Sequence, residues 1–162
     1  MPYLLDADVF IRAKNLHYGL DFCPAFWDWL LAAHAEGMVF SIEKVFDDLQ
    51  AGADELSSWA AAAPAGFFRS PDASVLPSLG VVSTWATGKG YEPAAISTFL
   101  QVSDYYLVAQ AHAYGFTVVT HEVPSASVRR IKIPDACLGI GIKVMTPFEM
   151  LRRERARFVL GR

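Results

Sequence analysis

The chain has 162 residues, of which 53% are hydrophobic, with a formal net charge of −3 and a mean hydropathy of +0.26. This length and composition favour one compact domain over residues 1–162 with a substantial core, and they exclude a disordered chain. No apolar run reaches the ~20 residues that a membrane helix needs, which excludes a transmembrane span.

The two cysteines indicate a reducing compartment. Cys23 and Cys137 stand far apart without metal-type spacing, and no signal-like segment opens the chain. We therefore expect a cytoplasmic protein that needs no disulfide.

The charge is unevenly distributed along the chain. Residues 1–128 contain 14 acids and 5 Lys or Arg, whereas residues 129–162 contain 3 acids and 9 Lys or Arg. The basic end either holds a polyanion near an acidic site or forms a solvated, Arg-rich last helix whose charges suit the helix dipole.

The first half of the chain alternates between strand and helix patterns. The expected strands are 3–11, "YLLDADVFI", and 38–42, "MVFSI". The expected helices are 23–37, with Pro24 in its first turn, and 43–52, started by Ser41 and ended at Gly52.

The second half continues the alternation. Residues 54–101 are expected to be mainly helical at 54–62 and 93–101, with connections around 64–80 and 87–93. A helix at 103–115, a strand at 116–122 and a strand-helix unit at 142–158 follow, the last with a capping box of Thr146, Pro147 and Glu149. The alternation predicts an α/β fold with three α/β/α layers and a central parallel sheet.

Two acids close the first expected strand. Asp6 and Asp8 lie on one side of that strand if it stays extended, because side chains alternate with period two. Ionised carboxylates about 4 Å apart repel by roughly 4 kcal/mol at an effective dielectric of about 20, so the pair implies a proton, a cation or separation. Alternatively, Asp8 caps or turns the chain after a strand that ends at Asp6.

Asp104 begins the helix at 103–115. On a helical wheel it shares a face with Leu107, Val108 and Ala111, the apolar stripe that must pack on the sheet, so its carboxylate is expected to face inward. The structural alternative is an acid in the first turn that complements the helix dipole, with Ser103 as the cap.

Further acids follow other strands. In the helix at 43–52, Glu43 and Asp48 flank the apolar stripe and Asp47 lies nearly opposite; periodicity does not choose between Glu43 and Asp48. Glu122 comes directly after the strand "FTVVTH". Acids that gather at the carboxyl edge of a parallel sheet are typical of a site for Mg²⁺ or Mn²⁺.

Three sequence blocks resemble PIN domains. "LLDADVFI" is similar to the opening strand of that family, and "SIEKVFDDLQAG" is similar to its second block, aligned on Asp48, Leu49 and Gly52. "SDYYLVAQAHAYGFTVVTHE" resembles the third block and matches Asp104, Thr120 and Glu122. "FCPAFWDWL", "THE" and "RRIKIPDAC" look like a PIN-like branch related to VapC toxins.

The resemblance implies a metal-dependent endoribonuclease, toxin-like and restrained by a separate antitoxin protein. Asp6, Asp48, Asp104 and Glu122 would be catalytic and carry one or two Mg²⁺ or Mn²⁺ ions, with Asp8 and Thr120 in support. The family more often has Glu where Asp48 stands and Asp where Glu122 stands, so the number of ions stays open. The sequence also leaves open whether the protein forms a homodimer.

Cations just beyond the expected site are the candidates for contacts with RNA phosphates. These are Arg129, Arg130 and Lys132, and the alternative is a solvated loop. His121 could contact phosphate or metal, although a lone histidine at a strand end is more often incidental.

Two other functions remain open from the sequence. A HAD-like phosphatase also begins with an apolar strand and Asp-x-Asp, but it expects a later Lys and a paired-Asp block that "SDYYLVAQA" does not supply. The second alternative is a PIN-like module that binds RNA or a protein without cutting.

Overall fold

The computed structural model describes residues 2–161 and contains a five-stranded sheet in which every neighbouring pair is parallel. The strand order is β3-β2-β1-β4-β5. Their bounds are β1 Tyr3–Leu5, β2 Val39–Ile42, β3 Phe68–Arg69, β4 Thr117–Val119 and β5 Val144–Met145.

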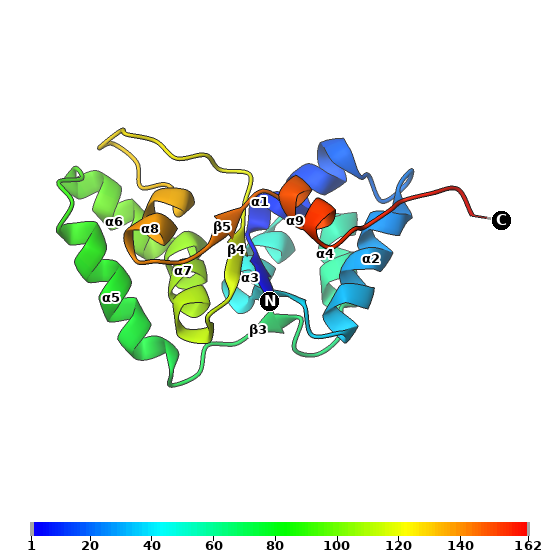
Figure 1. Ribbon diagram of the computed structural model, residues 1–162, viewed down its shortest axis with the longest axis horizontal. Helices are drawn as coiled ribbons and strands as arrows, with labels where there is room; N and C mark the ends of the chain where they lie inside the picture. Colours follow the sequence, from blue (N-terminus) through cyan, green and yellow to red (C-terminus); the bar gives the residue numbers. More distant parts are fainter. Residues whose placement is uncertain (1, 162) are drawn as a thin grey trace.

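Helices connect these strands and cover both faces of the sheet, which confirms the predicted three-layer α/β/α arrangement. Figure 1 shows α5, α6, α7 and α8 on one side of the sheet and α2 and α4 on the other. The bounds are α1 Ala7–Arg12, a π-helical turn η1 Ala13–His17, α2 Pro24–Ala35, α3 Glu43–Ala51, α4 Glu55–Ala61, α5 Val75–Thr87, α6 Pro93–Gln101, α7 Ser103–Tyr114, α8 Ile133–Gly139 and α9 Pro147–Arg153.

The first predicted strand is too long by six residues. It ends at Leu5, and Asp6 then accepts a hydrogen bond from the Ala7 N–H at 2.7 Å as the N-cap of α1. An aspartate side chain that accepts a hydrogen bond from a free N–H favours the start of a helix. The buried apolar residues Val9 and Phe10 therefore belong to a helix and not to a strand.

Two other local expectations are wrong, and one helix was not predicted. Ser41 does not cap α3; it is a buried strand residue whose hydroxyl donates to the Leu5 carbonyl at 2.6 Å and ties β2 to β1. The expected connection at 64–80 contains β3 and the first part of α5. Helix α8, within the segment 123–141, was not predicted.

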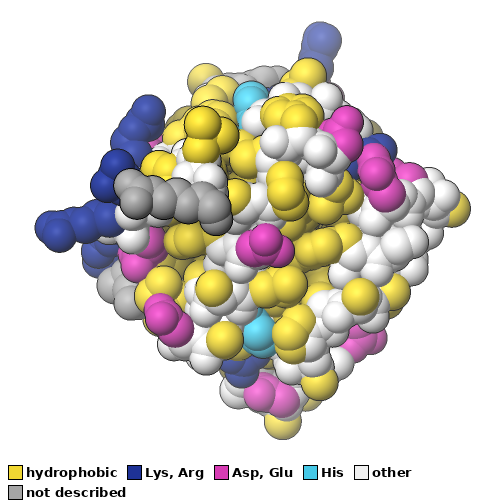
Figure 2. Space-filling model, turned by 90° about the vertical axis from the view of Figure 1, so that its right-hand side faces the viewer, with side chains coloured by type: hydrophobic (Ala, Val, Ile, Leu, Met, Phe, Trp, Pro, Cys, Tyr) yellow, Lys and Arg dark blue, Asp and Glu magenta, His cyan; other side chains and the backbone are white. Residues whose placement is uncertain are grey.

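The basic end of the chain divides into two parts. Arg129, Arg130 and Lys132 lie in the segment between β4 and α8, whereas Arg155 and Arg157 follow α9 in the stretch that runs toward α2 (Figure 1). There Phe158 packs on the rings of Tyr18 and Phe26, with centroids 5.6 and 6.1 Å apart. Figure 2 views this end of the molecule, where apolar side chains spread over the centre, and a group of Lys and Arg side chains projects at the left edge with another at the top.

Candidate active site

The strand order sets the place for a site. The chain leaves β1 for β2 on one side, whereas β4 lies on the other side of β1 and leads to β5. Ligands bind beyond the carboxyl ends of the strands at such a reversal of order. The residues that follow these two strands are Asp6 after β1 and Thr120 after β4.

Asp6 is fixed between the two strands. Its backbone N–H donates to the Val119 carbonyl at 2.9 Å, Oδ1 caps α1, and Oδ2 accepts the Thr120 hydroxyl at 2.9 Å. Only 5% of the residue is exposed. Burial, followed by the nearby carboxylates of Asp8 and Asp104, raises the pKa of Asp6 well above its ordinary value.

Asp8 shares the Thr120 hydroxyl with Asp6. It lies in the first turn of α1, where its Oδ2 is 3.4 Å from Thr120 Oγ1 and its Oδ1 accepts the His121 N–H at 3.3 Å. The two aspartates therefore face a common point, as the sequence suggested. They do so because the chain enters helix α1 at Ala7, and not because side chains alternate along an extended strand. Thr120 Oγ1 also accepts the Glu122 N–H at 3.1 Å, so one hydroxyl orders three acidic residues.

Asp104 faces inward from α7, as its helical wheel predicted. Leu107, Val108 and Ala111 on the same face are fully buried, and Asp104 is partly buried. Burial is the largest cause that raises the pKa of Asp104; Arg130 lowers it, and the carboxylates of Asp8 and Asp48 raise it. Ser103 makes no side-chain cap, and Val102 occupies the N-cap position.

Glu122 carries a buried oxygen without a hydrogen bond. Its Oε1 is inaccessible to solvent and has no hydrogen-bond partner among the described residues. The nearest cations are Arg130 Nη2 at 3.9 Å and Lys132 Nζ at 4.0 Å, too far for a hydrogen bond. Burial and then the carboxylate of Asp104 raise the pKa of Glu122, while Lys132 and Arg130 lower it.

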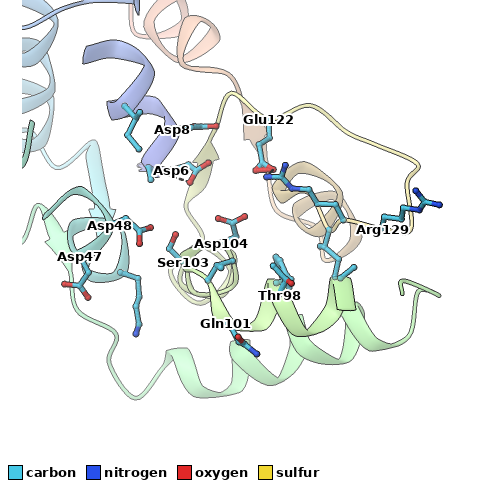
Figure 3. Close-up of a pocket in the computed structure, with 18 of the residues that line it drawn as sticks. Asp6, Asp8, Asp47, Asp48, Thr98, Gln101, Ser103, Asp104, Glu122 and Arg129 are labelled. Atoms are coloured by element: carbon cyan, nitrogen blue, oxygen red, sulfur yellow. Dashed lines mark hydrogen bonds and ion pairs between the residues drawn. The ribbon is translucent and has the colours of Figure 1, made fainter. Parts of the chain in front are cut away.

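A cavity of about 1010 Å³ joins these residues (Figure 3). Six acids line it, which we call the acidic cluster: Asp6, Asp8, Asp47, Asp48, Asp104 and Glu122. Four cations also line it: Arg12, Lys44, Arg129 and Arg130. The formal excess is two negative charges, which a single divalent cation would balance.

The second block contributes Asp48 and Asp47 to the cavity, and not Glu43. Glu43 accepts a hydrogen bond from the Ser70 hydroxyl outside the cavity. Asp48 points toward the cavity in Figure 3, and Asp47 lies beside it. The helical wheel placed Asp47 opposite the apolar stripe, which is true, but the cavity extends over the exposed side of α3 and reaches this residue as well.

Two cations and a wall of the cavity were missed by sequence reasoning. Arg12 lies four residues after Asp8 on α1, and Lys44 lies four residues before Asp48 on α3. This spacing puts each cation on the same helix face as an acid, and it would have been a usable signal once α1 was recognised as a helix. Helix α6 closes the cavity with small residues including Ala94 and Thr98.

The remaining predicted residues have ordinary surroundings. Arg129 is exposed and pairs with Glu92 at 3.9 Å, while Lys132 touches Glu122 but does not line the cavity. The His121 ring packs against His17 and Phe148, with centroids 5.4 and 5.5 Å away. Burial is the largest cause that lowers the pKa of His121.

The chemical type of the donor atoms suits a hard divalent cation. Carboxylate oxygens from four segments converge on the cavity, one Glu122 oxygen is buried without a hydrogen bond, and Asp6 is buried beside other acids. Oxygen ligands of this kind are those that Mg²⁺ and Mn²⁺ prefer. As the side chains stand, no three His, Cys, Asp or Glu within residues 2–161 lie close enough together to hold a metal.

Comparison with known proteins assigns the chain to a family and supports its fold. A family model described as "Domain of unknown function (DUF4411)" matches residues 3–158. The chain belongs to the DUF4411 family. A solved structure of FitAB bound to an IR36 DNA fragment is similar to this DUF4411 protein, with 18% identity and a TM-score of 0.57 over 90% of this chain and 95% of that chain.

The similarity to FitAB establishes a PIN-like fold for the DUF4411 protein. No curated protein sequence matches the chain. Within residues 2–161, none of the helices is both long enough and apolar enough to span a membrane.

Proposed function

We propose that this DUF4411 protein is a metal-dependent endoribonuclease. The observation that carries the proposal is the acidic cluster at the switch point of a PIN-like sheet, where Asp6 is buried and one Glu122 oxygen has no hydrogen-bond partner. Burying mutually repelling carboxylates costs stability, and a site that holds a cation offsets that cost.

Asp6, Asp48, Asp104 and Glu122 would hold one or two Mg²⁺ or Mn²⁺ ions. The chemistry that such an ion supplies when bound is activation of water and stabilisation of the charge on the leaving ribose oxygen. Asp8 and Thr120 support the cluster, because the Thr120 hydroxyl positions Asp6 and its oxygen holds the Glu122 backbone. No side-chain nucleophile is required in this scheme.

The cations of the segment after β4 would position the RNA. Arg129 and Arg130 line the cavity, and Lys132 lies 4.0 Å from Glu122 behind it. Arginine and lysine side chains bind backbone phosphates without reading sequence, so these residues would orient the scissile bond over the acids.

The wider role that we propose is that of a cytoplasmic toxin whose activity a separate antitoxin protein restrains. The sequence blocks that resemble VapC-related toxins support an antitoxin partner. The similar structure, FitAB, is bound to a DNA fragment, which supports a nucleic-acid partner in general. A homodimer belongs to the same proposal and is tested by the mass of the purified protein in solution.

Cleavage of a mixed set of structured RNAs tests the nuclease proposal. The parent and Asp104→Asn are compared with Mg²⁺, with Mn²⁺ and with chelator, and Asp28→Asn, an exposed acid on α2, serves as the matched control. We expect metal-dependent cleavage that the control keeps and Asp104→Asn loses. If the parent binds RNA but cuts none of it with either metal, the chain is a binding module; aspartyl-phosphate labelling of Asp6 would instead indicate a phosphatase.

A further inference from the structure

The cavity has cations on two sides of its acids. Arg129 and Arg130 belong to the segment after β4, whereas Arg12 ends α1 and Lys44 lies in the first turn of α3. Figure 3 shows Asp104 between α3, which carries Asp48, and the segment that carries Arg129. Helices α1 and α3 pack against each other. The helices that carry Arg12 and Lys44 and the segment that carries Arg129 and Arg130 therefore form two different walls of the cavity, with Asp104 between them.

Among the cations that line the cavity, Arg12 and Lys44 differ from Arg129 and Arg130 in having no carboxylate partner within residues 2–161. Arg129 and Arg130 each form an ion pair, with Glu92 and Glu122, at 3.9 Å. Within residues 2–161 neither Arg12 nor Lys44 has a carboxylate oxygen within 4 Å, although each is four residues from an acid of its own helix. Both are exposed. Their charges are therefore free for an external anion.

Lys44 is held at the cavity by an aromatic ring. Its Nζ lies 4.9 Å from the centroid of the Tyr106 ring, and Tyr106 is two residues beyond Asp104 on α7. A cation over an aromatic face is attracted to it, which keeps the lysine near the acids despite its flexible stem.

Apolar side chains are exposed inside the same cavity. Ile11 and Val102 line it, with 40% and 39% of their surfaces exposed. A nucleotide presents phosphate, sugar and an apolar base face together, so a cavity that offers cations and apolar surface fits a nucleic-acid strand better than a small polyanion.

We propose that Arg12 and Lys44 bind backbone phosphates on the side of the acidic cluster opposite Arg129 and Arg130, so that a single nucleic-acid strand crosses the cavity. The proposal rests on the nuclease function above and extends it to the path of the strand. A strand held on both sides presents an internal phosphodiester to the acids, which suits an endonuclease.

Salt dependence of RNA binding tests this path. All proteins carry Asp104→Asn so that the RNA stays intact, and binding of a fluorescein-labelled single-stranded RNA is measured by anisotropy in Mg²⁺ at several KCl concentrations. Each phosphate contact contributes about −0.7 to the slope of log affinity against log salt for a single strand. Arg12→Ala with Lys44→Ala should reduce the magnitude of the slope by about 1.4 and weaken binding to all sequences alike.

Two controls accompany the double variant. Lys89→Ala with Arg157→Ala removes two exposed cations that do not line the cavity, and it should leave the slope unchanged. Arg12→Lys with Lys44→Arg keeps both charges, so its slope should equal that of the Asp104→Asn background.

Three results would overturn the proposal: an unchanged slope in the Arg12 and Lys44 alanine variant, an equal loss in the Lys89 and Arg157 variant, or no RNA binding by the Asp104→Asn background. Cleavage by the parent together with an unchanged slope refutes the strand path alone. A reduced slope without cleavage by the parent refutes the nuclease while the strand path stands.

Discussion

Replacing Asp6 by asparagine should stabilise the protein in the absence of metal. Asp6 Oδ2 and Asp8 Oδ2 lie 2.9 and 3.4 Å from the same Thr120 hydroxyl oxygen, so these two atoms are separated by no more than the sum of those distances. Unit charges about 6.3 Å apart repel by about 2.6 kcal/mol at an effective dielectric of about 20. Asparagine removes this repulsion, and it caps a helix about as well as aspartate.

The measurement is thermal unfolding of the parent and Asp6→Asn in chelator at pH 7. A gain of about 2.6 kcal/mol in the free energy of unfolding raises Tm by roughly 5–10 °C in a chain of this size. The pKa of Asp6 is raised in the folded state, so ionisation of Asp6 costs stability as the pH rises above the ordinary aspartate value. The advantage of the variant should therefore grow between about pH 4 and pH 7.

Adding Mn²⁺ should cancel the difference in stability between the two proteins. A ligand that binds only the folded state at a hundred times its Kd stabilises it by about 2.7 kcal/mol, and this gain should appear in the parent and be absent from Asp6→Asn. Asp28→Asn, the exposed control, should behave like the parent throughout. An Asp6→Asn protein that is less stable than the parent in chelator at pH 7 would refute the argument that the acidic cluster is strained by repulsion.

Three further predictions concern the fold and its pH dependence. A Cβ at Gly139 would lie 2.0 Å from Trp85 Nε1, so Gly139→Ala should lower the free energy of unfolding by about 1–3 kcal/mol. A Cβ at Gly80 in α5 meets nothing within 4 Å, so Gly80→Ala should raise the free energy of unfolding by about 0.5–1 kcal/mol, and urea unfolding measures both changes. The Tyr3 hydroxyl donates to Glu154 at 2.5 Å, and burial together with this contact raises the pKa of Tyr3 to about 12. The Tm of the parent should therefore fall as the pH rises from 10 toward 12, and the Tm of Tyr3→Phe should fall less steeply. The raised pKa values of the buried carboxyls in the acidic cluster mean that the folded state binds more protons than the unfolded state. Lowering the pH from 7 to about 5 in chelator should therefore raise Tm, and a fall in Tm would contradict the raised pKa values.

The sequence predicted the layers of the fold because strand and helix patterns alternate clearly in most of the chain. The helix at 93–101 has the bounds of α6, and the capping box of Thr146 and Glu149 forms as expected. Gly115 ends α7 with a φ of +72°, a conformation that glycine adopts without strain.

Other elements were missed because their local signals conflict with their tertiary environment. Helix α5 contains Pro77 and Gly80, which usually mark connections, yet it buries Val75 and Val82 and packs against α7. Strand β3 has only two residues and is defined by its pairing with β2.

The candidate site was predictable in its acids and not in its cations. Carboxylates after apolar strands give a local pattern, and the four acids of the PIN-like blocks all line one cavity. Arg12 carries no such pattern, because its position depends on α1 beginning at Ala7, directly after the Asp6 cap. The cap itself is a tertiary feature, since Thr120, directly after β4, donates a hydrogen bond to its second oxygen.

The most direct test of the central claim is a Mn²⁺ titration of the purified protein, with free Mn²⁺ followed by electron paramagnetic resonance. The acidic cluster predicts saturable binding by the parent and by Asp28→Asn, and loss of that binding in Asp104→Asn. Equal binding by all three proteins, or none by the parent, would contradict the claim that these carboxylates hold a divalent cation.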